Sequence, residues 1–130
     1  MIVSAIITAA GSGSRFGEQK QFKELKGMAL YSHSLNQFLL CEEIYEIILV
    51  VPLARVNEIK KEINNIQTIK KIIVVGGGKR RQDSVENGLL STSDKTELVC
   101  IHDGARPFVS KELIKKSISA CSGNDGAIIA

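Results

Sequence analysis

The sequence predicts an α/β fold, a three-layer sandwich with a mostly parallel, Rossmann-like sheet. Short apolar runs rich in Ile and Val alternate with longer amphipathic segments, which is the pattern of parallel strands connected by helices. The first run, residues 2–8, lacks polar alternation, as expected of a strand buried on both faces. At 130 residues the chain is long enough for one domain with a single core.

Continuous apolar, β-branched runs are predicted as strands. In chain order they span residues 2–8, 44–51, 72–75, 98–101 and 126–130. Pro52 stops the second run because proline cannot donate a sheet hydrogen bond. The last run ends without a turn or a polar tail, so we expect residues 1–130 to be the N-terminal portion of a single domain that is incomplete at its C-terminus.

Amphipathic segments between these runs are predicted as helices. Three of them cover residues 30–41, 56–66 and 81–90, and a fourth begins after Ser110, whose hydroxyl is a suitable N-cap. The apolar positions that carry the helical spacing are Leu35, Phe38, Leu39, Val56, Ile59, Ile63, Ile66, Val85 and Leu89. In the fourth helix the expected inner stripe consists of Leu113, Ile114, Ile118 and Cys121.

Composition and charge exclude several classes of function. The formal net charge is +3, from 17 basic and 14 acidic residues, and the basic pairs stand beside acidic residues, which is unlike a nucleic-acid interface. No apolar run approaches the length of a membrane span, so no membrane partner is expected. The first strand begins without a secretion leader, and the three cysteines are odd in number and widely spaced. We therefore expect a cytoplasmic protein with reduced thiols.

The segment that follows the first strand predicts a phosphate-binding loop. Its glycines, Gly11, Gly13 and Gly17, allow backbone conformations that side chains forbid, and backbone N–H groups in such turns bind anions. Arg15 and Lys20 add two positive charges to the same loop. Two further unusual segments, residues 76–78 and 102–107, also follow strands, and we expect all three at the ligand-binding edge of the sheet.

Two familiar glycine-rich nucleotide sites do not fit. The dinucleotide-binding pattern fails because Gly17 comes one residue too late after Gly13, and because Pro52 follows the second strand where an acidic residue for the ribose is expected. The Gly-Lys-Ser/Thr sequence of a P-loop is also absent from the chain. The loop therefore predicts another kind of phosphate site.

Three motifs together are more specific. They are Ala9-Ala10-Gly-x-Gly-x-Arg-x-Gly continuing to Lys20-Gln21, Gly-Gly-x-x-Arg-x-Asp-Ser-Val from Gly77 to Val85, and His-Asp-x-Ala-Arg-Pro from His102 to Pro107. In this order and spacing they resemble the 2-C-methyl-D-erythritol 4-phosphate cytidylyltransferase family. The resemblance implies a fold of the nucleotide-diphospho-sugar transferase type. It also implies Mg²⁺-dependent transfer of CMP from CTP to a sugar-alcohol phosphate, with release of pyrophosphate, in non-mevalonate isoprenoid biosynthesis, and a homodimer for the full-length family.

Nucleotidyl transfer needs alignment and charge neutralisation, which suits the cations of the first loop. Arg15 and Lys20 are the predicted catalytic residues, Arg15 on the β/γ oxygens and Lys20 on the α-phosphate. The residues predicted to bind CTP are Ala9, Ala10, Gly11, Gly13, Arg15, Lys20, Gly77, Gly78, Arg81, Asp83 and Ser84. Asp83 and Ser84 could also cap the helix that follows, while Arg81 and Asp83 could brace the loop.

Asp103 is the predicted ligand of Mg²⁺ or another divalent cation, because such ions on triphosphates usually take one or two protein carboxylates. The resemblance places Asp103 and Arg106 at the sugar phosphate. It also implies that further catalytic residues follow Ala130, so these 130 residues are expected to have little activity alone. Gln19 stands where the family commonly has proline. Two alternatives remain: a ribitol-5-phosphate cytidylyltransferase, and a non-catalytic nucleotide-binding or interaction module.

Overall fold

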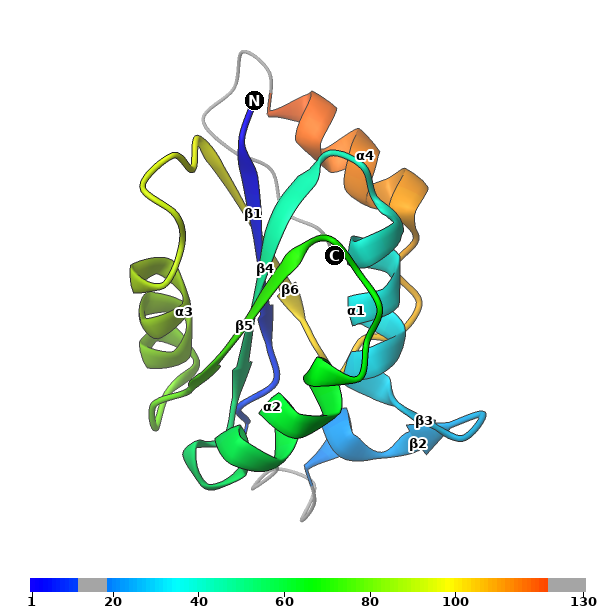
Figure 1. Cartoon of the computed structure of the whole chain (residues 1–130), viewed down its shortest axis with the longest axis vertical. Coiled ribbons are helices and arrows are strands. Elements are labelled where there is room, and N and C mark those ends of the chain that lie inside the picture. Colours follow the sequence, from blue (N-terminus) through cyan, green and yellow to red (C-terminus); the bar gives the residue numbers. More distant parts are fainter. Residues whose placement is uncertain (12–18, 122–130) are drawn as a thin grey trace.

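A parallel four-stranded sheet forms the centre of the molecule (Figure 1). The computed structural model describes residues 1–11 and 19–121. The strands are β1 (Val3–Thr8), β4 (Ile44–Val51), β5 (Lys71–Gly76) and β6 (Leu98–Asp103). They lie in the order β5-β4-β1-β6, and every neighbouring pair is parallel. The carboxyl ends of all four strands therefore meet at one edge.

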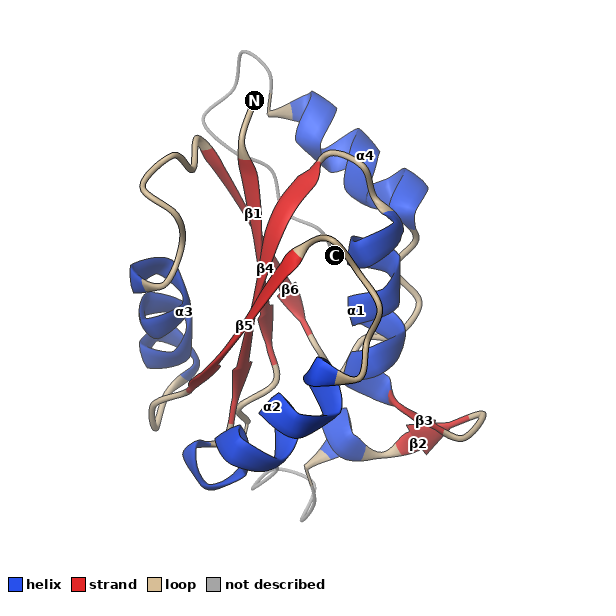
Figure 2. Cartoon of the chain, in the orientation of Figure 1, coloured by secondary structure: helices blue, strands red, loops and turns tan. Residues whose placement is uncertain are grey.

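Helices cover both faces of this sheet, which confirms the predicted three-layer sandwich (Figure 2). Three of them, α1 (Leu30–Leu40), α2 (Val56–Asn64) and α4 (Lys111–Ala120), lie on one side. On the other side lies α3 (Arg81–Leu90). Two short 3₁₀ helices, η1 (Lys20–Phe22) and η2 (Leu53–Arg55), follow the first loop and β4. Along the chain the four strands of the sheet alternate with the four α-helices, as predicted.

The core follows from the side-chain alternation within the strands. All of β1 is buried, with Ile7 in the large cluster that also contains Phe38 and Ile114, and Ile6 in a smaller cluster on the α3 side. A strand covered on both faces has no solvent face, which explains why its sequence shows no polar alternation. The cysteines Cys41, Cys100 and Cys121 are free thiols, as expected.

Two apolar positions differ from the predicted inner faces. Leu113 of α4 is 41% exposed, although Ile114 and Ile118 are buried as predicted. Leu89 of α3 is 43% exposed, and the residues that α3 buries are Ser84 and Gly88. A Cβ atom on Gly88 would lie 2.8 Å from Cγ2 of Ile6, so this helix packs closely against the sheet through small residues.

A short hairpin, β2 (Glu24–Leu25) and β3 (Met28–Ala29), was not predicted. Its turn places Lys26 and Gly27 at positive φ, which suits a two-residue hairpin turn. The predicted strand at 126–130 lies outside the described residues. None of the helices in residues 1–11 and 19–121 has the length and apolar character that a membrane span requires.

Glu46 is a buried carboxylate near the amino end of the sheet. One of its oxygens accepts hydrogen bonds from Ser4 Oγ at 2.6 Å and from the Ser93 backbone N–H at 2.7 Å. These bonds fasten the connection between α3 and β6 to the sheet. We expect Glu46→Ala to lower the free energy of unfolding by about 1–2 kcal/mol, since it removes the acceptor of the Ser93 N–H and one of the two partners of the buried Ser4 hydroxyl. Urea unfolding measures this, and Glu112→Ala, on the surface of α4, is the control that should change little.

Candidate active site

Three loops meet at the carboxyl edge of the sheet, as the sequence predicts. Thr8 at the end of β1 is in register with Asp103 at the end of β6, while Val51 of β4 is in register with Gly76 of β5. Backbone hydrogen bonds continue past the strands, from Gly104 N to Thr8 O and from Gly77 N to Val51 O, both at 2.8 Å. The glycine-rich loop therefore leaves the sheet between the other two motifs.

Gly77 packs where no side chain fits. A Cβ atom at this position would lie 2.3 Å from Cβ of Ala10 and 2.6 Å from Oγ of Ser84. At the adjacent Gly78, a Cβ atom would lie 2.4 Å from Cβ of Asp83. These contacts bring two of the predicted CTP-binding segments together at the start of α3.

Asp83 caps α3, which is one of the roles that the sequence left open for it. Its carboxylate accepts hydrogen bonds from the Arg80 backbone N–H at 3.1 Å and from the Arg80 guanidinium at 3.0 Å. The same guanidinium holds the pKa of Asp83 below its usual value, chiefly through the side-chain hydrogen bond. Ser84 is buried and faces Gly77. Asp83 therefore orders the loop on which Gly77 and Gly78 lie.

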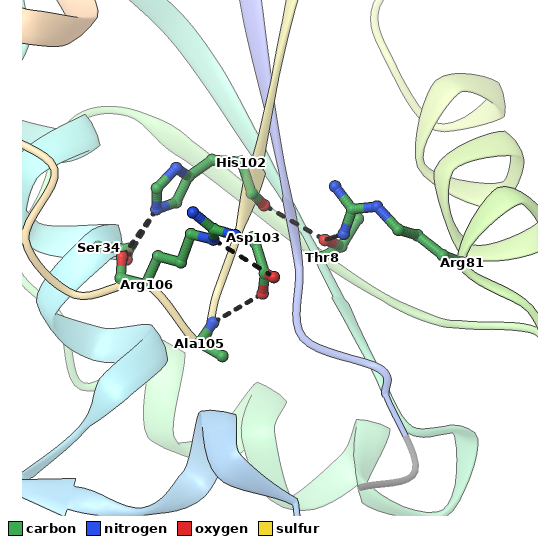
Figure 3. Close-up of polar contacts among 7 residues, drawn as sticks. All are labelled: Thr8, Ser34, Arg81, His102, Asp103, Ala105 and Arg106. Atoms are coloured by element: carbon green, nitrogen blue, oxygen red, sulfur yellow. Dashed lines mark hydrogen bonds and ion pairs between the residues drawn. The ribbon is translucent and has the colours of Figure 1, made fainter. Parts of the chain in front are cut away.

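Arg81 connects two of the motifs (Figure 3). Its guanidinium donates a hydrogen bond to Thr8 Oγ1 at 2.8 Å, and that hydroxyl donates to the His102 backbone carbonyl at 3.3 Å. This chain of contacts crosses from α3 over the end of β1 to β6. The bracing role expected for Arg81 is thus present, but with Thr8 as a partner that sequence reasoning did not identify.

His102 is buried beneath the turn that follows β6 (Figure 3). Its Nε2 lies 2.9 Å from the Arg106 backbone carbonyl and 3.1 Å from Ser34 Oγ, which itself donates to the same carbonyl at 2.8 Å. Burial lowers the pKa of His102, and its Nδ1 has no hydrogen-bond partner among the described residues. His102 is therefore a packed residue that supports the turn, as predicted.

The turn at 103–106 presents Asp103 and Arg106 to solvent. Asp103 Oδ1 accepts a hydrogen bond from the Ala105 backbone N–H at 2.9 Å, while Oδ2 lies 4.0 Å from Nε of Arg106 (Figure 3). The Asp103 side chain is 42% exposed and that of Arg106 is 68% exposed. A carboxylate with one oxygen held by the backbone and the other near the surface is suitably placed for an incoming ligand.

Asp103 offers one carboxylate to a metal ion, and it is part of no larger cluster of metal-ligating side chains among the described residues. Within residues 1–11 and 19–121, no cluster of three or more His, Cys, Asp or Glu side chains could hold a metal ion. Mg²⁺ bound to a triphosphate commonly uses one or two carboxylates, phosphate oxygens and water. The single carboxylate of Asp103 therefore fits such an ion and does not fit a closed protein site.

Lys20 is the catalytic candidate that the structure describes. It is exposed at the start of η1, and the next residue, Gln21, is buried against Ala9. Lys20 therefore lies close to the point where the loop leaves β1. Arg15 and Gly13 lie outside the described residues, so the predicted convergence of Arg15, Lys20 and Asp103 stays a prediction.

Ser34 supports the 103–106 turn from α1, and we expect Ser34→Ala to lower the free energy of unfolding by about 1 kcal/mol. This substitution removes the Ser34 hydroxyl, one of the two groups that bond to the Arg106 carbonyl. Chemical denaturation measures the change. Ser117→Ala is the matched control, because the Ser117 hydroxyl bonds only locally, to Leu113 O within α4. An equal effect from the two variants would contradict a special role for Ser34.

Comparison with known proteins agrees with the three motifs. Residues 3–130 match the family described as IspD, 2-C-methyl-D-erythritol 4-phosphate cytidylyltransferase. The enzyme of that name from Clostridium botulinum is 42% identical over 119 residues, which are 90% of this chain and 53% of the relative. The one from Alkaliphilus oremlandii is 41% identical over 130 residues, or 98% of this chain and 55% of the relative.

The crystal structure of 4-diphosphocytidyl-2C-methyl-D-erythritol synthase from Anaerococcus prevotii superimposes with a TM-score of 0.79 and 38% sequence identity. The match covers 92% of this chain and 50% of that one. This chain thus spans about half the length of the relatives that it matches. The family match extends over nearly all of its residues, however. This chain therefore belongs to the 2-C-methyl-D-erythritol 4-phosphate cytidylyltransferase family.

Proposed function

We propose that this chain forms the nucleotide-binding part of a cytidylyltransferase that transfers CMP from CTP to 2-C-methyl-D-erythritol 4-phosphate and releases pyrophosphate. The observation that carries the proposal is the meeting of three motifs at one sheet edge. Gly77 lies against Ala10 and Ser84 on one side, and Thr8 is in register with Asp103 on the other. Family membership supports the reaction class, and the names of the relatives support the acceptor.

In this proposal the protein aligns the two substrates and neutralises charge. A phosphate oxygen of the acceptor attacks the α-phosphorus of CTP, the bond to the β-phosphate oxygen breaks, and pyrophosphate leaves with the negative charge. Because the second pKa of a phosphate monoester is about 6, the attacking oxygen is already ionised near neutral pH. No general base is needed, which agrees with a His102 that is buried and engaged by the Arg106 carbonyl and Ser34.

Lys20 and Arg15 are the proposed catalytic residues, acting as cations on the α-phosphate and on the β/γ oxygens. Deleting such a transition-state contact costs roughly 10²–10³ in rate. The glycine-rich segments are proposed to bind the nucleotide, with Gly77 and Gly78 at the base. Arg106 is proposed to bind the phosphate of the acceptor.

Asp103 is the proposed ligand of a divalent cation, Mg²⁺ or one like it. When bound, such an ion screens the charge of the triphosphate and of the departing pyrophosphate. We also propose a homodimer for the full-length protein, as the family resemblance implies, and a cytoplasmic location, as the cysteine content and the start of the sequence predict.

The first test is calorimetric titration of the 130-residue chain with CTP in the presence of Mg²⁺, beside parallel titrations with ATP and GTP. Saturable binding of CTP that the purine nucleotides do not match supports the proposal. No heat with CTP would favour the alternative of a non-catalytic module that does not bind nucleotides.

The second test addresses the acceptor. Residues 1–130 joined to the second half of the Anaerococcus prevotii synthase, which shares this fold, provide a chain of full family length. Pyrophosphate release is then measured with 2-C-methyl-D-erythritol 4-phosphate and with ribitol 5-phosphate in competition. Preference for ribitol 5-phosphate would replace the proposed acceptor by the close alternative.

A further inference from the structure

Two glutamine side chains hold the segment around Lys20 against the end of β1. Resting on the proposed function, we infer that Gln21, assisted by Gln19, is a positioning residue for Lys20 in polyphosphate binding. Both amides converge on backbone carbonyls at the start of the phosphate-binding loop, and we call these contacts the amide clamp. Neither glutamine has a role in the proposed function.

Gln21 carries the stronger half of the clamp. Its side chain is 5% exposed, and Nε2 donates hydrogen bonds to Ala9 O at 2.8 Å and to Gly11 O at 2.9 Å. A primary amide has two donor hydrogens, so these two carbonyls use its full donor capacity. Ala9 is itself held to the sheet by a hydrogen bond from its N–H to Val50 O at 2.7 Å. Gln21 is thereby fastened to the sheet through one intervening residue.

Gln19 carries the weaker half. Its Nε2 donates to Gly11 O at 3.2 Å, so that one carbonyl accepts hydrogen bonds from two side-chain amides. The two glutamines flank Lys20 directly. Restraint on both neighbours limits where the backbone of Lys20 can lie, while Lys20 itself stays exposed at the surface.

A second set of contacts fixes the other side of η1. The ring of Phe22 lies 3.7 Å from the guanidinium carbon of Arg55, measured to the ring centroid, and 5.6 Å from the ring of Tyr31, edge to face. The Phe22 backbone N–H also bonds to Gln19 O at 3.1 Å. Residues 21 and 22 therefore point into the body of the protein. Because Gln19, Gln21 and Phe22 are held in this way, the backbone position of Lys20 is restrained.

The chemistry of residue 21 argues for an amide and not merely for a side chain of that size. A buried apolar side chain would leave the Ala9 and Gly11 carbonyls without this donor, and an unsatisfied buried acceptor destabilises a structure. A glutamate of equal size would place a carboxylate against two carbonyl oxygens. A side-chain amide, with two donor hydrogens and no charge, satisfies both carbonyls at once.

The test measures CTP and cytidine affinity by calorimetry with the 130-residue chain and its variants. We expect Gln21→Ala to weaken CTP binding about tenfold and Gln19→Ala about threefold, with cytidine binding unchanged, since the clamp acts on a phosphate contact. Gln37→Ala is the matched control: Gln37 accepts a hydrogen bond from Lys111 N far along the chain, and its removal should leave both affinities unchanged.

A double-mutant cycle separates positioning from packing. If the clamp acts through Lys20, adding Gln21→Ala to Lys20→Ala should weaken CTP binding no further. Equal loss of CTP and cytidine affinity, or additive effects in the cycle, would overturn the inference in favour of general loop stability. If Gln21→Ala fails to fold, the same cycle with Gln19→Ala decides by the same criteria. Absence of CTP binding by the unmodified chain overturns the proposed function, whereas unchanged CTP affinity in both glutamine variants overturns this inference alone.

Discussion

Gly77→Ala is expected to lower the free energy of unfolding by about 3 kcal/mol, near the upper end of what overpacking usually costs. The new methyl group would lie 2.3 Å from Cβ of Ala10 and 2.6 Å from Oγ of Ser84, and the Ala10 Cβ is fixed to the backbone and cannot rotate away. Relief therefore requires the loop before α3 to move away from the end of β1. Because both segments are proposed to bind CTP, we expect nucleotide affinity to fall as well.

Chemical denaturation and CTP calorimetry measure the two effects of this substitution. Gly11→Ala is the control for unfolding, because a Cβ atom at Gly11 meets no atom within 4 Å in the part of the chain that the structure describes. We expect that control to leave stability nearly unchanged. Equal stability of the two variants would show that the close approach of Gly77 to Ala10 is not a determinant of the site.

Lys20→Ala is expected to weaken CTP binding about 10- to 100-fold, since a hydrogen bond to a charged group contributes about 1.5–3 kcal/mol and tenfold corresponds to about 1.4 kcal/mol. The expected loss arises from one contact to the triphosphate. It should therefore be much smaller for cytidine, which has no phosphate. Calorimetric titration of both ligands checks this.

Lys23→Ala is the matched control for Lys20→Ala. Lys23 is exposed three residues further along the chain, and its removal changes the net charge by the same amount. A general electrostatic attraction between the protein and CTP would make the two variants alike, and both losses would shrink in salt. That result would remove Lys20 from the proposed catalytic residues.

The sheet and its helices could be predicted because burial leaves a strong pattern in the sequence. The run from Ile44 to Val51 coincides with β4, and the predicted helix at 81–90 coincides with α3. A strand buried on both faces must be apolar throughout, and proline or glycine marks its end. The edge at which the motifs meet follows from parallel topology alone.

Other features depend on contacts that no local pattern reveals. Leu113 fits the spacing of an inner stripe, yet α4 turns this residue toward solvent and buries Ile114. The partners of Arg81 and of His102, Thr8 and Ser34, come from segments at least 68 residues away in the chain. The hairpin β2–β3 is only two residues long on each side, too short to show an alternation of its own. Gln21 belongs to a recognised motif, but only the structure shows what its amide contacts.

The close packing of α3 links Gly88 to the candidate site at the first turn of the helix. Gly88, near the end of this helix, lets it approach Ile6 of β1, and Ser84, one turn earlier, faces Gly77. A side chain at position 88 would meet Ile6 and Val50 of the sheet, and we expect the helix to move away from β1 to relieve these contacts. The spacing between the start of α3 and the end of β1, where the proposed nucleotide site lies, thus depends partly on a glycine one turn further along the buried face of the helix.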